Sequence, residues 1–213
     1  MHDLRVEAVP WWAVLAASAS PVLLVGGFLA AAELQPSSYN PVRDTISQLA
    51  GARATDPWVM TSVLLAVGSC YLIASLGLRP AGPLSRSLLA AGGLATLAIA
   101  LFRLPDRGYS VGHEVAVVLA ALTCSTWPAF AWRPRLPAPL LTRRRSYEGT
   151  AVLVGLVVWY ALETHGLLLG VAERCAAAGP PLWLCAVTLT TRRATRRRAA
   201  ETSRGRVSMS GSS

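Results

Sequence analysis

Long apolar runs bounded by arginines constrain this chain more than any other feature. All 20 Lys+Arg residues are arginine, and most of them lie at the edges of such runs. Six runs are long enough, or nearly so, to cross about 30 Å of hydrocarbon as helices rising about 1.5 Å per residue. They cover residues 11–32, 59–78, 84–102, 113–132, 150–170 and 175–191. The sequence therefore predicts an all-α, polytopic membrane protein, with a six-transmembrane-helix bundle forming one membrane domain over residues 1–192.

The arginines also predict an orientation. Fifteen of them fall on one set of alternate loops and only five on the other set. Because positively charged residues stay on the cytoplasmic side, both termini are predicted to be cytoplasmic. Trp11, Trp12, Trp58 and Trp132 lie at run ends, where an amphipathic ring suits the headgroup region.

Composition limits the partners of the chain. With 53% hydrophobic residues among 213, there is no room for a separate soluble domain beside six spans. The net charge of +9 comes from loop and tail arginines without interleaved aromatic residues, which favours membrane lipids over nucleic acid. Residues 193–213 are predicted to be a disordered, Arg-rich cytoplasmic tail whose arginines contact anionic inner-leaflet lipid.

The loop after the first run predicts a short outer-loop helix over residues 41–50. Asn40 suits the N-cap position, Pro41 suits the first helical position, and Gly51 suits the end. The apolar stripe of this helix comprises Val42, Ile46 and Leu49. Two placements stay open: the helix lies flat at the outer interface as a connector, or it dips between the spans.

Two further polar clusters lie on the same predicted side. In the segment 103–114, Gly and Pro favour a tight loop, with His113 at the start of span four. Glu163 is thirteen residues along span five, about 20 Å from its inner edge, which makes it the costliest carboxylate in the chain. His165 lies about 200° further around the same helix. One interpretation pairs Glu163 with Arg103 or Arg174 to hold the bundle; the other gives Glu163 a ligand-binding role.

Three segments of the chain resemble a known family. YNPVRDTISQLAG, FRLPDRGYSVGHE and GVAER followed by an apolar run are similar to the bacterial and archaeal membrane family called domain of unknown function 998. The resemblance extends from Trp11 to Thr191 and implies a six-helix bundle in a bacterial plasma membrane. That family has no established activity, and the resemblance directs attention to four residues: Ser47, Asp106, His113 and Arg174.

The polar residues of the outer side predict a binding site there. Seven acidic residues and two of the three histidines fall on that side, whereas the inner loops carry mainly arginine, which has no proton-transfer role at neutral pH. The candidate outer pocket comprises Arg43, Asp44, Ser47, Asp106, His113, Glu163 and Arg174. The predicted function is non-enzymatic, without a catalytic residue or cofactor: binding of a lipid headgroup, a small amphiphile or a membrane-protein partner.

Two alternatives stay open. The first is an outward-facing metal-dependent lipid hydrolase, in which His113, His165 and Asp106 hold a zinc ion that activates water. The chain has no H-E-x-x-H, Cys-x-x-Cys or Gly-x-Ser-x-Gly motif in support. The second is a small-solute transporter, which usually needs charged or broken helices at mid-membrane. Pro128 and the Pro180–Pro181 pair are the interruptions in otherwise apolar spans.

The predicted orientation is testable with single cysteines introduced after the native cysteines are replaced. Ser38→Cys and Arg107→Cys should react with an impermeant thiol reagent in intact cells, whereas Arg144→Cys and Ser203→Cys should not. Labelling of Arg144→Cys from outside would reverse the assigned orientation.

Overall fold

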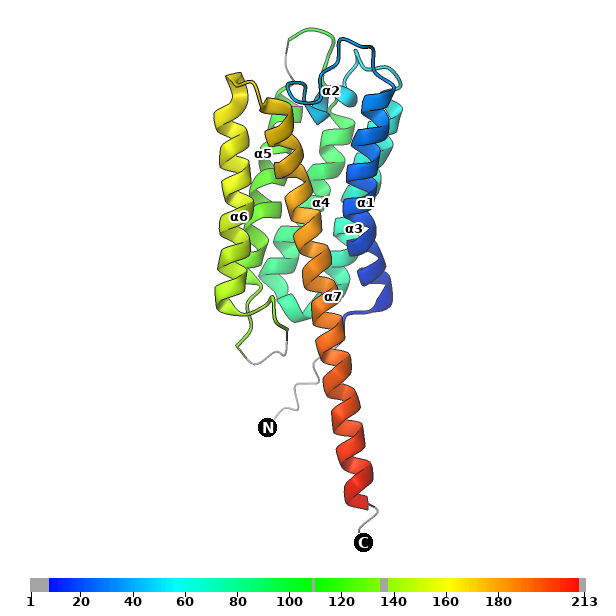
Figure 1. Cartoon of the computed structure of the whole chain (residues 1–213), viewed down its shortest axis with the longest axis vertical. Helices are drawn as coiled ribbons and strands as arrows, with labels where there is room; N and C mark the ends of the chain where they lie inside the picture. The colour runs from blue at the N-terminus through cyan, green and yellow to red at the C-terminus, as the bar shows by residue number, and fades with distance from the viewer. Residues whose placement is uncertain (1–7, 109, 135–137, 211–213) are drawn as a thin grey trace.

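The computed structural model describes residues 8–108, 110–134 and 138–210. Within these ranges every regular element is a helix, which confirms the all-α prediction. The elements in chain order are α1 (Trp11–Glu33), α2 (Ile46–Leu49), α3 (Trp58–Gly77), η1 (Arg79–Ala81), α4 (Pro83–Leu101), α5 (Val111–Thr126), η2 (Trp127–Phe130), α6 (Arg143–Leu162), η3 (Glu163–His165) and α7 (Leu169–Ser210). The long helices run side by side, and the short α2 lies across one end, called here the α2 end (Figure 1).

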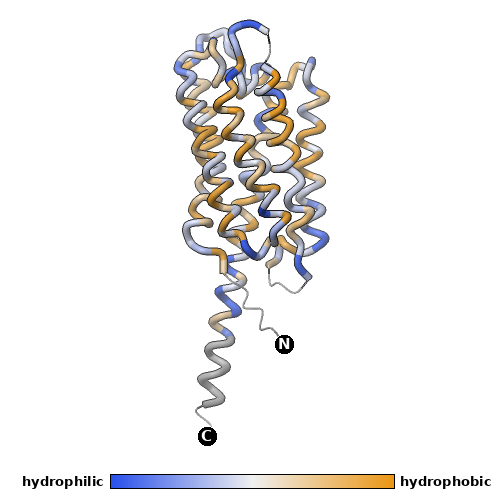
Figure 2. Tube along the Cα trace, turned by 180° about the vertical axis from the view of Figure 1, so that it is seen from behind, coloured by the Kyte–Doolittle hydropathy of each residue, from blue (hydrophilic) through white to orange (hydrophobic). Residues whose placement is uncertain are grey.

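Within the described residues, three helices are long and apolar enough to cross a membrane. They are α1, α3 and α4, of 23, 20 and 19 residues. Many of their large apolar side chains point outward; Val22 is 71% exposed and Leu94 is 58% exposed. Hydrophobic residues extend along the packed helices, whereas hydrophilic residues gather near their two ends (Figure 2). An apolar outer surface of this extent is expected where lipid, not water, surrounds the helices.

The long helices close into a ring. Each packs against the next long helix in the chain, and α7 returns to pack against α1. The contact between α5 and α6 is the smallest in this ring. The short α2 packs against α1 and α7. The short α2 lies at one end of this ring (Figure 1).

Glycines bring neighbouring helices together. A Cβ atom added to Gly93 of α4 would lie 2.9 Å from the carbonyl oxygen of Gly68 in α3. A Cβ atom added to Gly68 would in turn lie 2.9 Å from the carbonyl oxygen of Gly93. The two backbones therefore cross at a distance that only glycine permits, as is common where helices pack in lipid.

The boundaries of α6 and α7 differ from the predicted spans 150–170 and 175–191. Thr142 caps α6, because its hydroxyl accepts the backbone N–H of Arg145 at 3.4 Å, so the helix begins among arginines rather than after them. Long arginine side chains allow this, since they extend their charge away from an apolar surface. The turn after Leu162 ends α6 early, and α7 starts at Leu169. Glu163 therefore lies past the end of α6, in η3, and Glu173 lies inside α7.

The helix α7 also continues beyond the packed region, through Ser210. It projects past the end of the ring that is opposite α2 (Figure 1). This differs from the disordered tail predicted for residues 193–213, of which 211–213 lie outside the described residues. The extension is rich in alanine and arginine, both strong helix formers, and it lacks proline.

The glycine crossing predicts a specific loss of stability. Gly93→Ala should lower the free energy of unfolding by about 1–3 kcal/mol, because the added methyl group overpacks the α3–α4 contact. The matched control is Gly155→Ala in α6, where an added Cβ atom has no neighbour within 4 Å. The measurement is denaturation of both variants in mixed micelles. Equal stability of the two variants would contradict the close crossing.

Candidate functional site

A buried carboxylate connects α7 to the loop at the α2 end. Glu173 is 9% exposed. Its carboxylate accepts the backbone N–H groups of Ile46 and Ser47, and the Ser47 hydroxyl donates to it at 3.0 Å. The first N–H groups of a helix have no acceptor within that helix, and a negative charge near them is favourable. Glu173 therefore stabilises the start of α2 from a helix 127 residues away in the chain.

The next residue, Arg174, binds the preceding part of the same loop. Its guanidinium donates to the carbonyl oxygens of Pro41 at 2.6 Å and Asp44 at 2.9 Å, and to the hydroxyl of Tyr39. It also lies over the ring of Phe28, 5.6 Å from the centroid. Arginine suits this role because its fixed fork of N–H groups reaches several acceptors at once.

The hydroxyl of Tyr39 bridges Arg174 and the loop backbone. It accepts from Arg174 and donates to the carbonyl oxygen of Thr45 at 3.4 Å. Burial raises the pKa of Tyr39, which outweighs the lowering effect of the neighbouring Arg174. Tyr39 therefore stays protonated at neutral pH and remains able to donate.

These contacts shorten the helix predicted over residues 41–50. The carbonyl oxygen of Val42 accepts the N–H groups of Gly170 and Val171 at 2.9 and 3.2 Å. Carbonyl groups that a longer helix would use are thus bound to α7. The helix begins only at Ile46, and Thr45, not Asn40, is its N-cap. We call residues 39–50 the α2 loop.

The structure separates the residues predicted to form one outer pocket. Ser47, Asp44 and Arg174 lie together at the contact between the α2 loop and α7. Arg43 is exposed on the same loop. Asp106 is exposed on the loop between α4 and α5.

The other two predicted residues stabilise helix ends. His113 is 3% exposed, and its Nδ1 lies 2.8 Å from the carbonyl oxygen of Phe102, which ties the start of α5 to the end of α4. Glu163 belongs to the predicted span 150–170 but lies in η3, past the end of α6, and accepts the N–H of Leu168 at 3.2 Å, just before α7. Among the described residues, neither side chain forms a hydrogen bond or ion pair with Glu173 or Arg174.

The residues of the alternative zinc site are not clustered. In the described ranges, no three His, Cys, Asp or Glu side chains lie in a group that could hold a metal ion. His165 is exposed in η3, and His113 is buried at the start of α5.

A cavity of about 140 Å³ lies inside the ring, beneath the α2 loop. Residues from α1 to α7 line it: Leu24, Ile46, Ser47, Leu64, Val67, Tyr71, Thr96, Ile99, Val117, Ala120, Ala121, Cys124, Ser125, Val157, Tyr160, Glu173, Ala176, Ala177 and Pro180. Its wall on α5 extends from Val117 to Ser125, about 12 Å along the helix axis at about 1.5 Å per residue. The cavity is therefore elongated, parallel to the helices, and mostly apolar.

Few polar groups interrupt this wall. Glu173 and Ser47 lie where the cavity meets the α2 loop. The hydroxyl of Ser125, on a residue 2% exposed, has no hydrogen-bond partner in the described part of the chain. Buried polar groups without a partner are uncommon, and one in a cavity wall is available to a ligand or to water.

One family model matches this chain, and its description is protein of unknown function (DUF998). The match covers residues 11–190. The chain belongs to the DUF998 family. This confirms the resemblance noted in the sequence, and the matched range of the DUF998 model includes the α2 loop, Glu173, Arg174 and the cavity. No curated protein and no solved structure matches the chain.

Sequence reasoning on this DUF998 protein missed Glu173 as a site residue. It began span six at residue 175, after Glu173, and assigned the buried position to Glu163. The signal that would have found it is the apolar sequence on both sides: Leu167 to Val171 before it and Ala176 to Ala178 after it. A carboxylate flanked in this way at helical spacing falls inside a helix rather than ahead of one.

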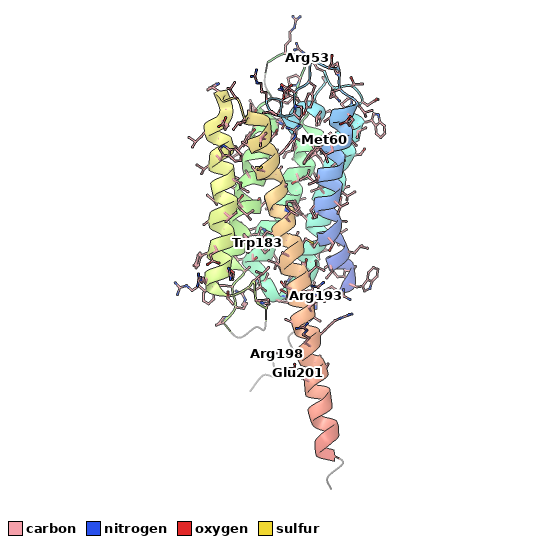
Figure 3. All side chains as sticks on the ribbon, in the orientation of Figure 1. Arg53, Met60, Trp183, Arg193, Arg198 and Glu201 are labelled. Atoms are coloured by element: carbon pink, nitrogen blue, oxygen red, sulfur yellow. The ribbon has the colours of Figure 1, made fainter. Side chains whose placement is uncertain are left out.

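The contacts of Arg174 predict that it immobilises the α2 loop. Arg174→Ala should speed amide hydrogen exchange across residues 39–50 by about tenfold or more, because hydrogen bonds to a charged group are among the stronger ones. The measurement is hydrogen–deuterium exchange by mass spectrometry. Arg53→Ala is the matched control, because Arg53 points away from the helices at the same end (Figure 3). Unchanged exchange in Arg174→Ala would contradict the clamping role.

Proposed function

We propose that this protein is a six-span integral membrane protein that binds an elongated amphiphile in the cavity between its helices. The observation that carries this proposal is the cavity itself: about 140 Å³, lined by residues of every long helix, mostly apolar, with Glu173 and Ser47 where it meets the α2 loop. The binding role replaces the wide outer pocket of the sequence prediction with a narrower internal site.

Six spans follow from extending the membrane assignment of α1, α3 and α4 to their neighbours. The helices α5, α6 and α7 complete the same ring. Together α5 and η2 cover Val111–Phe130, and α6 covers Arg143–Leu162, each long enough for about 30 Å of hydrocarbon. Exposed apolar side chains such as Val118 and Val152 lie on these two helices as well.

The size of the cavity limits what it holds. Apolar cavities of roughly 150 Å³ bind molecules about the size of benzene, whereas pockets for drug-sized ligands measure roughly 300–1,000 Å³. The site thus suits one narrow chain or small ring. Removal of apolar surface from water provides the affinity, at about 25 cal/mol per Å².

A binding role fits the carboxylate better than a catalytic one. The oxygens of Glu173 already accept hydrogen bonds from Ile46 and Ser47, so the carboxylate is engaged in positioning α2. None of the residues lining this cavity is a histidine. No residue is therefore assigned a catalytic function.

The orientation of the protein is part of the proposal. The α2 loop faces outward and both termini face the cytoplasm, where arginines of α7 contact anionic lipid. Arg193, Arg196 and Arg197 are exposed on the extension of α7, and Figure 3 labels Arg193 at its start. Basic residues just beyond a span are attracted to the negative inner leaflet.

Filling the cavity tests the proposed function. Decanol should raise the melting temperature of the wild-type protein in nonionic micelles, by about 2–4 °C for each kcal/mol of binding free energy. Ala121→Trp places an indole in the cavity wall and should abolish this shift. Leu122→Trp is the matched control, because Leu122 is 56% exposed on the outer face of the same helix. Equal shifts in all three proteins would mean that decanol acts through the micelle, and the proposed function would be wrong.

A further inference from the structure

We infer that the head of the bound amphiphile is a protonated amine placed beside Glu173, so that the site selects alkylammonium molecules. This inference rests on the proposed binding function and specifies its ligand class. It follows from the charge of the cavity wall and from the kind of hydrogen-bonding groups that the wall offers.

The wall contains a buried carboxylate. Glu173 lines the cavity, and the charge of the neighbouring Arg174 acts on it without a direct ion pair between the two side chains. The neighbouring Arg174 directs its guanidinium into the α2 loop. A buried carboxylate is costly unless a cation or hydrogen bonds compensate it, and here hydrogen bonds from Ile46 and Ser47 compensate it only in part.

Backbone carbonyl groups near Glu173 add to the acceptors. Pro180 and Pro181 have no N–H, so the carbonyl groups of Ala176 and Ala177 lose their usual helical donors. Ala176 and Ala177 line the same cavity as Glu173. They follow it by three and four residues, which places them on the same face of α7, one turn deeper. The helix α7 continues through both prolines, so the freed carbonyl groups need donors from outside the helix.

The cavity wall offers few hydrogen-bond donors. None of its lining residues is Arg, His or Trp, so the wall has hydroxyl groups but no side chain that only donates. An ammonium group supplies three donors and a positive charge, which match a carboxylate and nearby carbonyl groups. A carboxylate head would meet Glu173 as a like charge.

The apolar wall favours an organic cation over an inorganic one. Sodium or potassium would lose its hydration shell and find few oxygen ligands among residues such as Leu64, Val67, Ile99 and Val117. An alkylammonium ion places its apolar chain against those residues and its charge at Glu173. The elongated shape of the cavity along α5 fits such a chain.

The test compares probes that share one chain and differ in the head: decylamine, decanol and decanoate. Binding to the purified wild-type protein in nanodiscs of neutral lipid is measured by calorimetry, and Ala121→Trp is run in parallel to subtract partitioning into lipid. Decylamine should bind about tenfold more tightly than decanol or decanoate, as one charge-assisted hydrogen bond would provide. Glu173→Gln should lose this preference while it keeps decanol binding.

The outcomes separate this inference from the proposed function. Equal affinity of the wild-type protein for all three probes would overturn the head-group selection and leave cavity binding intact. Binding of none of them, or equal binding by Ala121→Trp, would overturn the proposed function itself. If Glu173→Gln does not fold, the order of the three probes on the wild-type protein decides. If sodium chloride stabilises the protein and decylamine does not bind to it, the site belongs to an inorganic ion and the inference is overturned.

Discussion

The contact between the Glu173 carboxylate and the first N–H groups of α2 is the interaction on which the α2 end of this protein depends. A four-residue helix has too few internal hydrogen bonds to be stable alone. The carboxylate supplies the missing acceptors for Ile46 and Ser47, and α2 in return supplies the hydrogen bonds that a buried negative charge requires. Burial of the Glu173 carboxylate and formation of α2 are therefore each unfavourable alone, and each lowers the free-energy cost of the other.

Glu173 and Arg174 are adjacent on α7 but face different surroundings. Successive residues of a helix are about 100° apart, so one side chain reaches the cavity wall while the other reaches the α2 loop. Arg174 binds Tyr39, Pro41 and Asp44, and Glu173 binds the start of α2. Both ends of the loop are therefore attached to one turn of one helix. A ligand that contacts Glu173 would act on the same group that positions α2.

The helices combine apolar outer faces with close inner crossings. Lipid gives little hydrophobic driving force for helix association, so packing depends on small residues and on polar contacts. Gly68 and Gly93 provide such a crossing between α3 and α4. The opposite side of the ring is looser, because α5 and α6 share the smallest contact. The cavity reflects this difference, since small side chains such as Ala120 and Ala121 line it from α5.

The sequence by itself determined the all-helical fold, the membrane character of α1, α3 and α4, and the family. Those features depend on local hydropathy and on short motifs, which are readable without a structure. The tertiary structure decided which carboxylate is buried. Hydropathy favoured Glu163, but Val42 binds the N–H groups at the start of α7 and Glu173 binds α2, contacts between segments that are far apart in the chain. No local pattern records such a contact, because its free energy belongs to two segments at once.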